Sequence, residues 1–268
     1  MIDKDGIKRP DKTDEHMHEI KNAKRKVKFD ENYSFRPRNI FFRLWVSFFR
    51  RLAITVFAIY WHTLGHIKIR NKKNLKGTHG KGFVVAVNHV SYMDDVSVCT
   101  LVFHWRRVYF TTLEQNIRRP WVGFFLRSLA GIPIPVSSVS GMRKFNDDIS
   151  YLLKKGKPIV YNPEGALWPH YREVRPFKRG AFVTAVKNDV PVLPIAVTFK
   201  RKQRRNGKYK YKLFLNVCEM QYADRNLKEK EASEKLMIQT QECIQNTVNH
   251  FYATEKSGFD DIKAEKTE

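Results

Sequence analysis

Short apolar runs alternate with segments of helical periodicity from about residue 67 to residue 218, and this alternation constrains the fold most strongly. Apolar runs of about four to eight residues are typical of buried strands. Strands that alternate with helices favour an α/β fold with a mixed, mostly parallel sheet flanked by helices. The predicted strands are 67–70, 83–87, 107–111, 131–134, 158–161, 192–198 and 211–217. The predicted helices are 94–103, 119–129, 143–154, 179–187 and 226–252.

The composition divides the chain into four segments. Residues 1–34 are polar and predicted to be mobile or loosely helical. Residues 35–66 are rich in aromatic and aliphatic side chains and are predicted to form a helical segment. Residues 67–253 form one α/β domain, large enough for a sizeable core. Residues 254–268 are charged and predicted to be disordered.

A strong positive charge indicates a polyanionic partner. The 50 Lys and Arg residues against 27 Asp and Glu give a net charge of +23, which suits nucleic acid or an anionic bilayer. No zinc-finger spacing, RRM-type aromatic motif or basic region with heptads is visible. The basic stretch 201–212 favours a hairpin with Asn206-Gly207 as its turn. We therefore expect anionic membrane lipids as partners and no nucleic acid.

The segment 35–66 carries the features of a membrane-surface element. Its stretch without charged residues runs from Leu52 to about Leu64, which is shorter than the roughly 20 apolar residues that span a bilayer. Tryptophans and arginines flank it, as in interfacial helices. The pattern predicts an interfacial helix or a re-entrant helical pair, and a buried core helix is the alternative. Residues 1–34 contain no apolar run typical of a cleaved signal peptide.

A histidine and an aspartate stand five positions apart directly after the apolar run 83–87. The order Asn88-His89-Val90-Ser91-Tyr92-Met93-Asp94 places His89 at a strand end and Asp94 about one helical turn further on. A neutral imidazole that is oriented by a carboxylate is a good general base near pH 7. The alternative is a helix start that is capped by Asn88 or Ser91.

Three further blocks follow in order: Gly131–Val136, Asn162-Pro163-Glu164-Gly165-Ala166 and Val190–Val197. With the His89 block they resemble the glycerolipid acyltransferase family over roughly residues 75–200. The resemblance implies a glycerol-3-phosphate acyltransferase-like fold in the domain 67–253. It also implies transfer of a fatty acyl group from acyl-CoA or acyl-carrier protein to a lysolipid hydroxyl, with no resident cofactor.

The resemblance also assigns the site residues. His89 is the expected general base, Asp94 orients it, and Glu164 and Gly165 contact the acceptor. The expected acceptor is 1-acylglycerol-3-phosphate, which would give phosphatidic acid. Another lysolipid or glycolipid, or a non-catalytic basic membrane-binding protein of the same fold, is the alternative.

Two departures concern the acceptor's phosphate. Val136-Ser137 and Ala166-Leu167 stand where the family's basic residues are expected. We therefore predict an acceptor site displaced toward residues 168–179, with cations from a nearby set; Arg143 and Lys144 are the reserve. The predicted set is Arg172, Arg175, Lys178 and Arg179.

The remaining polar residues give no further site. His62 and His66 share a helical spacing, but no third ligand is evident, so no metal site is predicted. The histidines of the polar segment, His16 and His18, are expected to be solvated. The expected location is the cell membrane, as a peripheral or monotopic protein with its catalytic domain on the cytoplasmic side.

Overall fold

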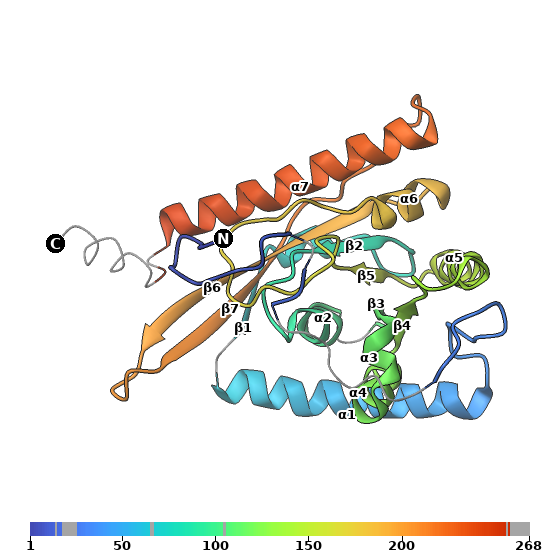
Figure 1. Cartoon of the computed structure of the whole chain (residues 1–268), viewed down its shortest axis with the longest axis horizontal. Helices are drawn as coiled ribbons and strands as arrows, with labels where there is room; N and C mark the ends of the chain where they lie inside the picture. Colours follow the sequence, from blue (N-terminus) through green and yellow to red (C-terminus); the bar gives the residue numbers. More distant parts are fainter. Residues whose placement is uncertain (14, 18–25, 65–66, 104–105, 256, 258–268) are drawn as a thin grey trace.

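A seven-stranded sheet forms the centre of the protein (Figure 1). The computed structural model describes residues 1–13, 15–17, 26–64, 67–103, 106–255 and 257. The strand order is β1-β7-β6-β2-β5-β3-β4, and every neighbouring pair is parallel except the antiparallel pair β6–β7. The mixed, mostly parallel sheet predicted from the sequence is confirmed. The strands are β1 (Ile67–Arg70), β2 (Val84–Val87), β3 (Tyr109–Leu113), β4 (Gly131–Ile134), β5 (Ile159–Tyr161), β6 (Val192–Gln203) and β7 (Tyr209–Val217).

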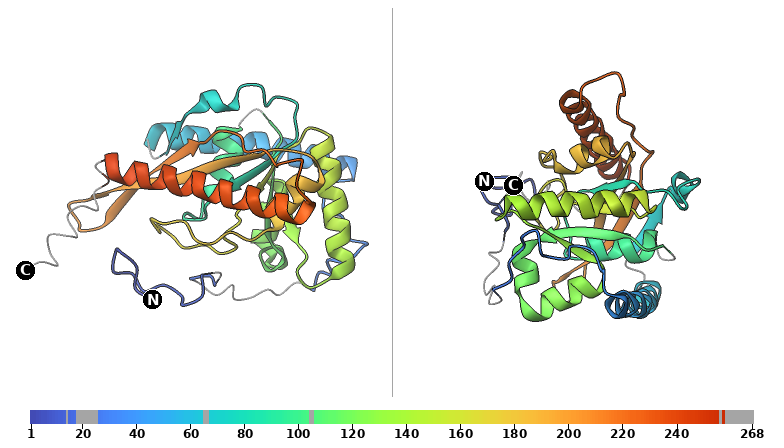
Figure 2. Two further views of the ribbon diagram at one scale, coloured as in Figure 1. Left: turned by 90° about the horizontal axis from the view of Figure 1, so that it is seen from above. Right: turned by 90° about the vertical axis from the view of Figure 1, so that its right-hand side faces the viewer.

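Helices cover both faces of this sheet (Figures 1 and 2). On one face lie α5, α6 and α7, and on the other lie α1, α2 and α4. The helices are α1 (Ile40–Leu64), α2 (Asp94–Ser97), α3 (Glu114–Arg118), α4 (Pro120–Ser128), α5 (Val139–Lys154), α6 (Gly180–Lys187) and α7 (Glu229–Thr254). A 3₁₀ turn, η1 (Lys72–Leu75), and a π-helical turn, η2 (Val98–Val102), complete the elements.

Strand β2 explains how the sequence fills both layers. Val84 and Ala86 pack into the core below α5, α6 and α7, whereas Val85 and Val87 pack into the core on the α1 and α2 side. Successive strand residues point to opposite faces, and a strand that is covered on both faces is apolar throughout. The strand ends at Val87, so the polar residues that follow emerge at the carboxyl edge of the sheet.

The hairpin predicted around Asn206-Gly207 is present. Strands β6 and β7 pair in register from Ile195 with Val217 to Gln203 with Tyr209, and five residues form the loop between them. Gly207 has a φ of 74°, a left-handed conformation that glycine adopts without strain. Both strands are longer than predicted, and the hairpin projects from the body of the molecule (Figure 1).

Several predicted elements differ from the structure. The predicted helix 94–103 is α-helical only over Asp94–Ser97 and continues as the π-helical turn η2. Strand β3 starts two residues later than predicted, and the short helix α3 has no counterpart among the predictions. Residues 1–13 and 15–17 are not loosely helical: they form turns and a bridge between Ile2 and Lys8. The predicted disordered tail lies almost wholly outside the described residues.

The segment 35–66 contains one uninterrupted helix, α1, which contacts η2 and α4. No helix in the described part of the chain combines the length and the apolarity needed to cross a bilayer.

Candidate active site

The carboxyl ends of the parallel strands meet at one edge of the sheet, where a cavity of about 380 Å³ opens. His89 follows β2, Asn162 follows β5 and Leu113 ends β3, and all three line this cavity. Ligands of open α/β sheets bind in such a position. Phe110, Val122, Leu126 and Ile134 give much of the wall an apolar character.

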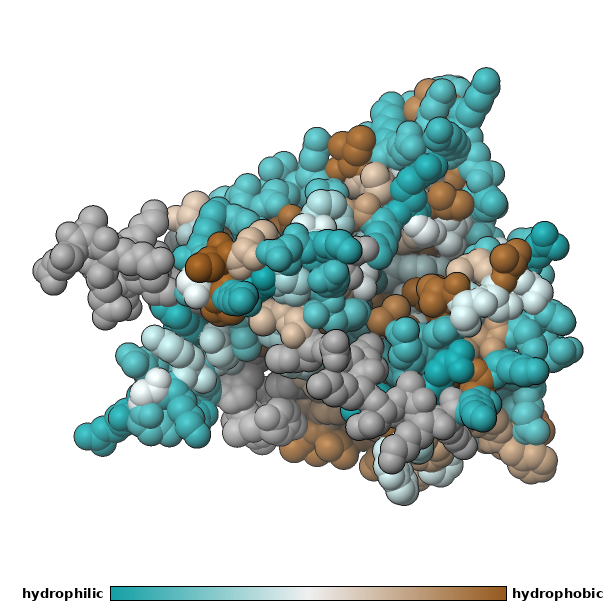
Figure 3. All heavy atoms as spheres, in the orientation of Figure 1, coloured by the Kyte–Doolittle hydropathy of each residue, from teal (hydrophilic) through white to brown (hydrophobic). Residues whose placement is uncertain are grey.

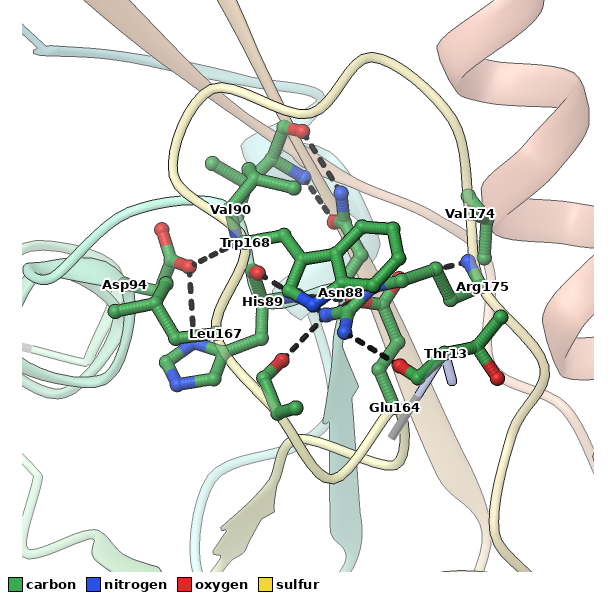
Figure 4. Close-up of polar contacts among 12 residues, drawn as sticks. Thr13, Asn88, His89, Val90, Asp94, Glu164, Leu167, Trp168, Val174 and Arg175 are labelled. Carbon is green, nitrogen blue, oxygen red and sulfur yellow. Dashed lines mark hydrogen bonds and ion pairs between the residues drawn. The ribbon is translucent and has the colours of Figure 1, made fainter. Parts of the chain in front are cut away.

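His89 and Asp94 form a fixed pair on this edge (Figure 4). The Nδ1 atom of His89 lies 3.3 Å from Oδ2 of Asp94. The same oxygen accepts hydrogen bonds from the backbone N–H groups of Val90 and Ser91, both at 2.8 Å. The Asp94 side chain is fully buried, whereas that of His89 is 18% exposed and lines the cavity. The carboxylate therefore orients the ring through its Nδ1 atom.

The electrostatic surroundings favour a histidine that gains a proton easily. Burial lowers the pKa of His89, but the hydrogen bond to Asp94 and the negative charges of Asp95 and Glu164 outweigh it and raise the pKa above its ordinary value. Burial also raises the pKa of Asp95, a further cavity residue, to about 6. The Nδ2 group of Asn162 donates to Asp95 over 2.8 Å. The surroundings thus stabilise the protonated form of His89.

Glu164 and Arg175 form a second pair that is sealed from solvent (Figure 4). One oxygen of Glu164 accepts from the backbone N–H of His89 over 3.1 Å and from the guanidinium of Arg175. The other accepts from the backbone N–H of Arg175 over 3.1 Å. The guanidinium carbon of Arg175 lies 4.6 Å from the ring centroid of Trp168. These contacts hold the backbone of His89, and a contact of Glu164 with the acceptor stays a prediction.

Gly165 lines the cavity in a conformation that only glycine adopts readily. Its φ is 76°, and a Cβ atom here would lie 2.8 Å from Cε of Lys178. Any larger residue would strain the backbone and displace the lysine. The side chain of Lys178 therefore lies beside the Gly165 loop, and its contact with the acceptor stays a prediction.

The other predicted cations lie outside the cavity wall. Arg172 pairs with Asp5, and Arg179 pairs with Glu234 over 3.2 Å and donates to Ser233. Arg175 is buried against Glu164. These ion pairs balance the charges of the three arginines. They do not test the predicted contact of these arginines with the acceptor. Of the reserve pair, Lys144 bonds Asp148, and Arg143 lines a separate small cavity.

Sequence reasoning missed Arg119. It is the one Lys or Arg among the described residues that line the cavity beside His89, and its guanidinium forms no ion pair within that part of the chain. Arg119 directly precedes α4, whose first residue is Pro120. The available signal was the dipeptide Arg118-Arg119 before that proline, which marks a helix start but not a site.

The prediction that His16 is solvated is wrong. Its ring lines the cavity together with His89, and its Nδ1 accepts from the backbone N–H of Leu167 over 3.3 Å. Accepting at Nδ1 places the ring proton on Nε2, a buried atom that has no partner among the described residues. Burial, followed by the charge of His89, lowers the pKa of His16, so the ring stays neutral near pH 7. His18 lies outside the described residues.

Backbone carbonyls hold this N-terminal segment in place. The indole Nε1 of Trp168 donates to the carbonyl of Glu15 over 2.7 Å, and Arg175 donates to the carbonyl of Thr13 over 2.9 Å. Residues far apart in the chain thus build one wall of the cavity. Within the described residues, no group of three His, Cys, Asp or Glu side chains is placed to hold a metal ion.

Comparisons with known proteins place this site within a matched region. A family model described as Acyltransferase matches residues 66–198, which include His89, Asp94 and Glu164. A chloroplastic 1-acyl-sn-glycerol-3-phosphate acyltransferase from Brassica napus is 30% identical over 118 residues, which are 42% of this chain and 32% of that protein. A chloroplastic protein of the same description from Arabidopsis thaliana is 27% identical over 159 residues, 58% of this chain and 39% of its own length.

A solved structure is similar in part. The crystal structure of a 1-acyl-sn-glycerophosphate acyltransferase from Thermotoga maritima aligns with a TM-score of 0.43 and 22% identity, over 66% of this chain and 71% of that one. The chain spans about a third of the length of its Brassica relative and about two fifths of its Arabidopsis relative.

Proposed function

We propose that this chain is a member of the acyltransferase family, whose model matches residues 66–198, and that it transfers a fatty acyl group from an acyl thioester to a hydroxyl of a lysolipid. The observation that carries the proposal is the orientation of His89 by Asp94 at the wall of a largely apolar cavity. A base beside an apolar cavity suits an acceptor hydroxyl whose reaction partner carries a hydrocarbon chain.

The chemistry needs no enzyme nucleophile. The acceptor hydroxyl loses its proton to Nε2 of His89 as its oxygen attacks the thioester carbonyl. The new C–O ester bond forms, the C–S bond breaks, and the proton passes from the imidazolium to the departing thiolate. Asp94 holds the ring tautomer and stabilises the imidazolium by charge. Asp95 adds negative charge close by.

The cavity suggests positions for the substrates. The apolar wall that includes Phe110, Leu126 and Ile134 suits an acyl chain. The guanidinium of Arg119 suits the phosphate of 1-acylglycerol-3-phosphate, because arginine binds phosphate in a bidentate fashion. The Nε2–H of His16 is a neutral donor, suited to the thioester oxygen or to a phosphate oxygen. The product with this acceptor is phosphatidic acid.

An exposed apolar face supports work at a membrane surface. Phe41, Phe48 and Ile59 of α1 are exposed, as is Trp121 of the neighbouring α4. In Figure 3, apolar side chains gather along the lower edge, the side on which α1 lies. Such a face inserts at the boundary between headgroups and acyl chains. We place the protein on the membrane as a peripheral or monotopic enzyme.

A panel of donors and acceptors tests the activity. Labelled acyl-CoA and acyl-carrier protein are each offered with 1-acylglycerol-3-phosphate, a lysolipid without a terminal phosphate, and a glycolipid, and the products are identified by mass spectrometry. We expect the fastest transfer to 1-acylglycerol-3-phosphate, with an acceptor KM that rises about tenfold or more in Arg119→Ala. Arg118→Ala, which alters the neighbouring arginine paired with Glu114, is the control.

The panel also separates the alternatives. Preference for another lysolipid or a glycolipid, with the acceptor KM unchanged in Arg119→Ala, would reassign the acceptor. No transfer to any acceptor, with vesicle binding intact, would favour a non-catalytic membrane-binding protein of this fold.

A further inference from the structure

A second cavity, lined by four cations, lies at the opposite edge of the sheet from the candidate active site. It has a volume of about 620 Å³ and is lined by Ser47, Arg50, Arg51, Ile54, Thr55, Arg107 and Lys157. Arg107 precedes β3 and Lys157 precedes β5, so both stand at the amino ends of parallel strands. His89 and Asn162 stand at the carboxyl ends. We call Arg50, Arg51, Arg107 and Lys157 the basic cluster.

Within the described residues, no carboxylate balances the basic cluster. None of its four members forms an ion pair with any carboxylate in the described part of the chain, and no acidic residue lines the cavity. Burial, followed by the charges of Arg107 and two further arginines, lowers the pKa of Lys157. Burial also lowers the pKa of Arg50, and Arg107 contributes to this shift. Cations gathered without a counterion repel one another, so the fold maintains them at a cost that an anion would remove.

The fold holds one member of the cluster rigidly. Arg50 is only 6% exposed, and its guanidinium donates to the carbonyls of Cys99, Phe103 and Arg106. These carbonyls belong to η2 and the loop after it, which packs on α1. Arg50 therefore ties α1 to the domain, whereas Arg107 and Lys157, both half-buried, supply charge that no described group uses.

The position of the cavity beside α1 indicates which kind of anionic molecule it suits. The lining residues 47, 50, 51, 54 and 55 recur at helical spacing and share one side of α1. The exposed apolar residues 41, 44, 48, 52 and 59 form the adjacent side. Arg51 and Thr55 stand at the border between the two sides. A molecule with a phosphate and hydrocarbon chains matches both surfaces at once.

We propose that this cavity binds the phosphate headgroup of an anionic membrane phospholipid, apart from the substrates of the candidate active site. The phosphate lies among Arg51, Arg107 and Lys157, and the acyl chains lie beside the apolar side of α1. The site fixes α1 against an anionic membrane. It concerns binding and not acyl transfer, so vesicle binding is its primary readout.

The test compares two double variants of the full chain. Arg107→Ala/Lys157→Ala removes two members of the basic cluster and spares Arg50. Lys228→Ala/Lys230→Ala removes the same charge from exposed positions at or beside the start of α7, on the other side of the sheet. Each protein is floated with vesicles of phosphatidylcholine alone and of phosphatidylcholine mixed with phosphatidylglycerol.

The expected result is selective for anionic lipid. The cluster variant loses about tenfold or more of its affinity for the mixed vesicles and keeps its affinity for phosphatidylcholine, since each basic residue near the surface adds to anionic-lipid binding. The α7 variant keeps both affinities. Phe41→Ser/Phe48→Ser lowers binding to both vesicle types, which separates the apolar face from the cluster. Without lipid, the cluster variant is at least as stable to heat as the wild type, because a repulsion has been removed.

Two results would overturn the proposal. Equal losses in the cluster and α7 variants would show that total charge, and not this cavity, governs binding. Unchanged vesicle binding in the cluster variant would assign the anion to a soluble source. Thermal stabilisation by inorganic phosphate, or a raised KM for acyl-CoA, each lost or altered only in the cluster variant, would identify that source.

Discussion

Two side-chain pairs lie at the carboxyl edge of the sheet, and they differ in access to the cavity. We call His89 and Asp94 the open pair, and Glu164 and Arg175 the sealed pair. His89 and Asp94 are joined at 3.3 Å, and the His89 ring lines the cavity. Glu164 and Arg175 are both at most 2% exposed and bond mainly to each other and to the backbone. The carboxylates of Asp94 and Glu164 thus have different roles: the first orients the ring of His89, and the second pairs with a buried arginine. A motif names the residues, but burial and partners decide which of them meet a substrate.

The two pairs are also connected. Glu164 accepts a hydrogen bond from the backbone N–H of His89, so the sealed pair fixes the backbone of His89. A buried pair with several hydrogen bonds is rigid, and an oriented base needs a rigid support. The open pair is therefore expected to govern turnover, and the sealed pair to govern stability.

The largest expected effect concerns the open pair. In His89→Ala the proposed proton acceptor is lost, so we expect kcat to fall by about 10²–10⁴ with the fold intact. His250→Ala, which changes an exposed histidine of α7, is the control and should retain full activity. Steady-state kinetics and circular dichroism measure the two properties. Wild-type turnover in His89→Ala would exclude this residue as the base.

The sealed pair gives the next effect, on the free energy of unfolding. Arg175→Met leaves the carboxylate of Glu164 buried without its cation, and breaking a buried pair in this way costs about 3–5 kcal/mol. Arg179→Met breaks an exposed pair with Glu234 and should cost at most about 1 kcal/mol. Urea denaturation measures both. A stable Arg175→Met protein with a raised acceptor KM would instead restore the acceptor role predicted for this residue from the sequence.

The pH dependence sharpens the account of the open pair. A histidine base acts only when neutral, and the pKa of His89, the proposed base, is raised above its usual 6.5, so kcat/KM should fall as the pH drops through a value above 6.5. Asp94→Asn removes the charged hydrogen-bond partner that contributes most to raising this pKa. The pH profile of kcat/KM for this variant should therefore have a lower maximum, and its acid limb should lie at lower pH than in the wild type. An unshifted limb would assign the titration to another group, such as Asp95.

Local patterns explain why part of this site was predictable. His89 and Asp94 follow an apolar run directly, so their spacing and the strand end are written within about ten residues. The order of short apolar runs likewise gave the strands and their mostly parallel sheet. The antiparallel hairpin was marked by Asn206-Gly207 at its turn.

Long-range packing explains the remainder. Arg175 looks like a surface cation in the sequence, and only the fold buries it against Glu164 and Trp168. Arg119 lines the cavity directly before α4, a helix that packs against α1, and no local pattern records this position. The π-helical turn η2 begins where the pattern predicts a continuing helix, and three carbonyls of η2 and the loop after it bond Arg50.

The smallest expected effect tests whether the open pair has help from outside its motif. His16 reaches the cavity from the N-terminal segment, and the bond from Leu167 to its Nδ1 leaves Nε2–H as a donor. A neutral hydrogen bond contributes about 0.5–1.5 kcal/mol, so His16→Phe should lower kcat/KM by about 2–10-fold. His16→Gln, whose amide also donates, should recover part of this loss. The control is His79→Phe, an exposed position. Equal kcat/KM in His16→Phe and the wild type would show that His16 only fills the wall, and catalysis would then rest on His89 and Asp94 without it.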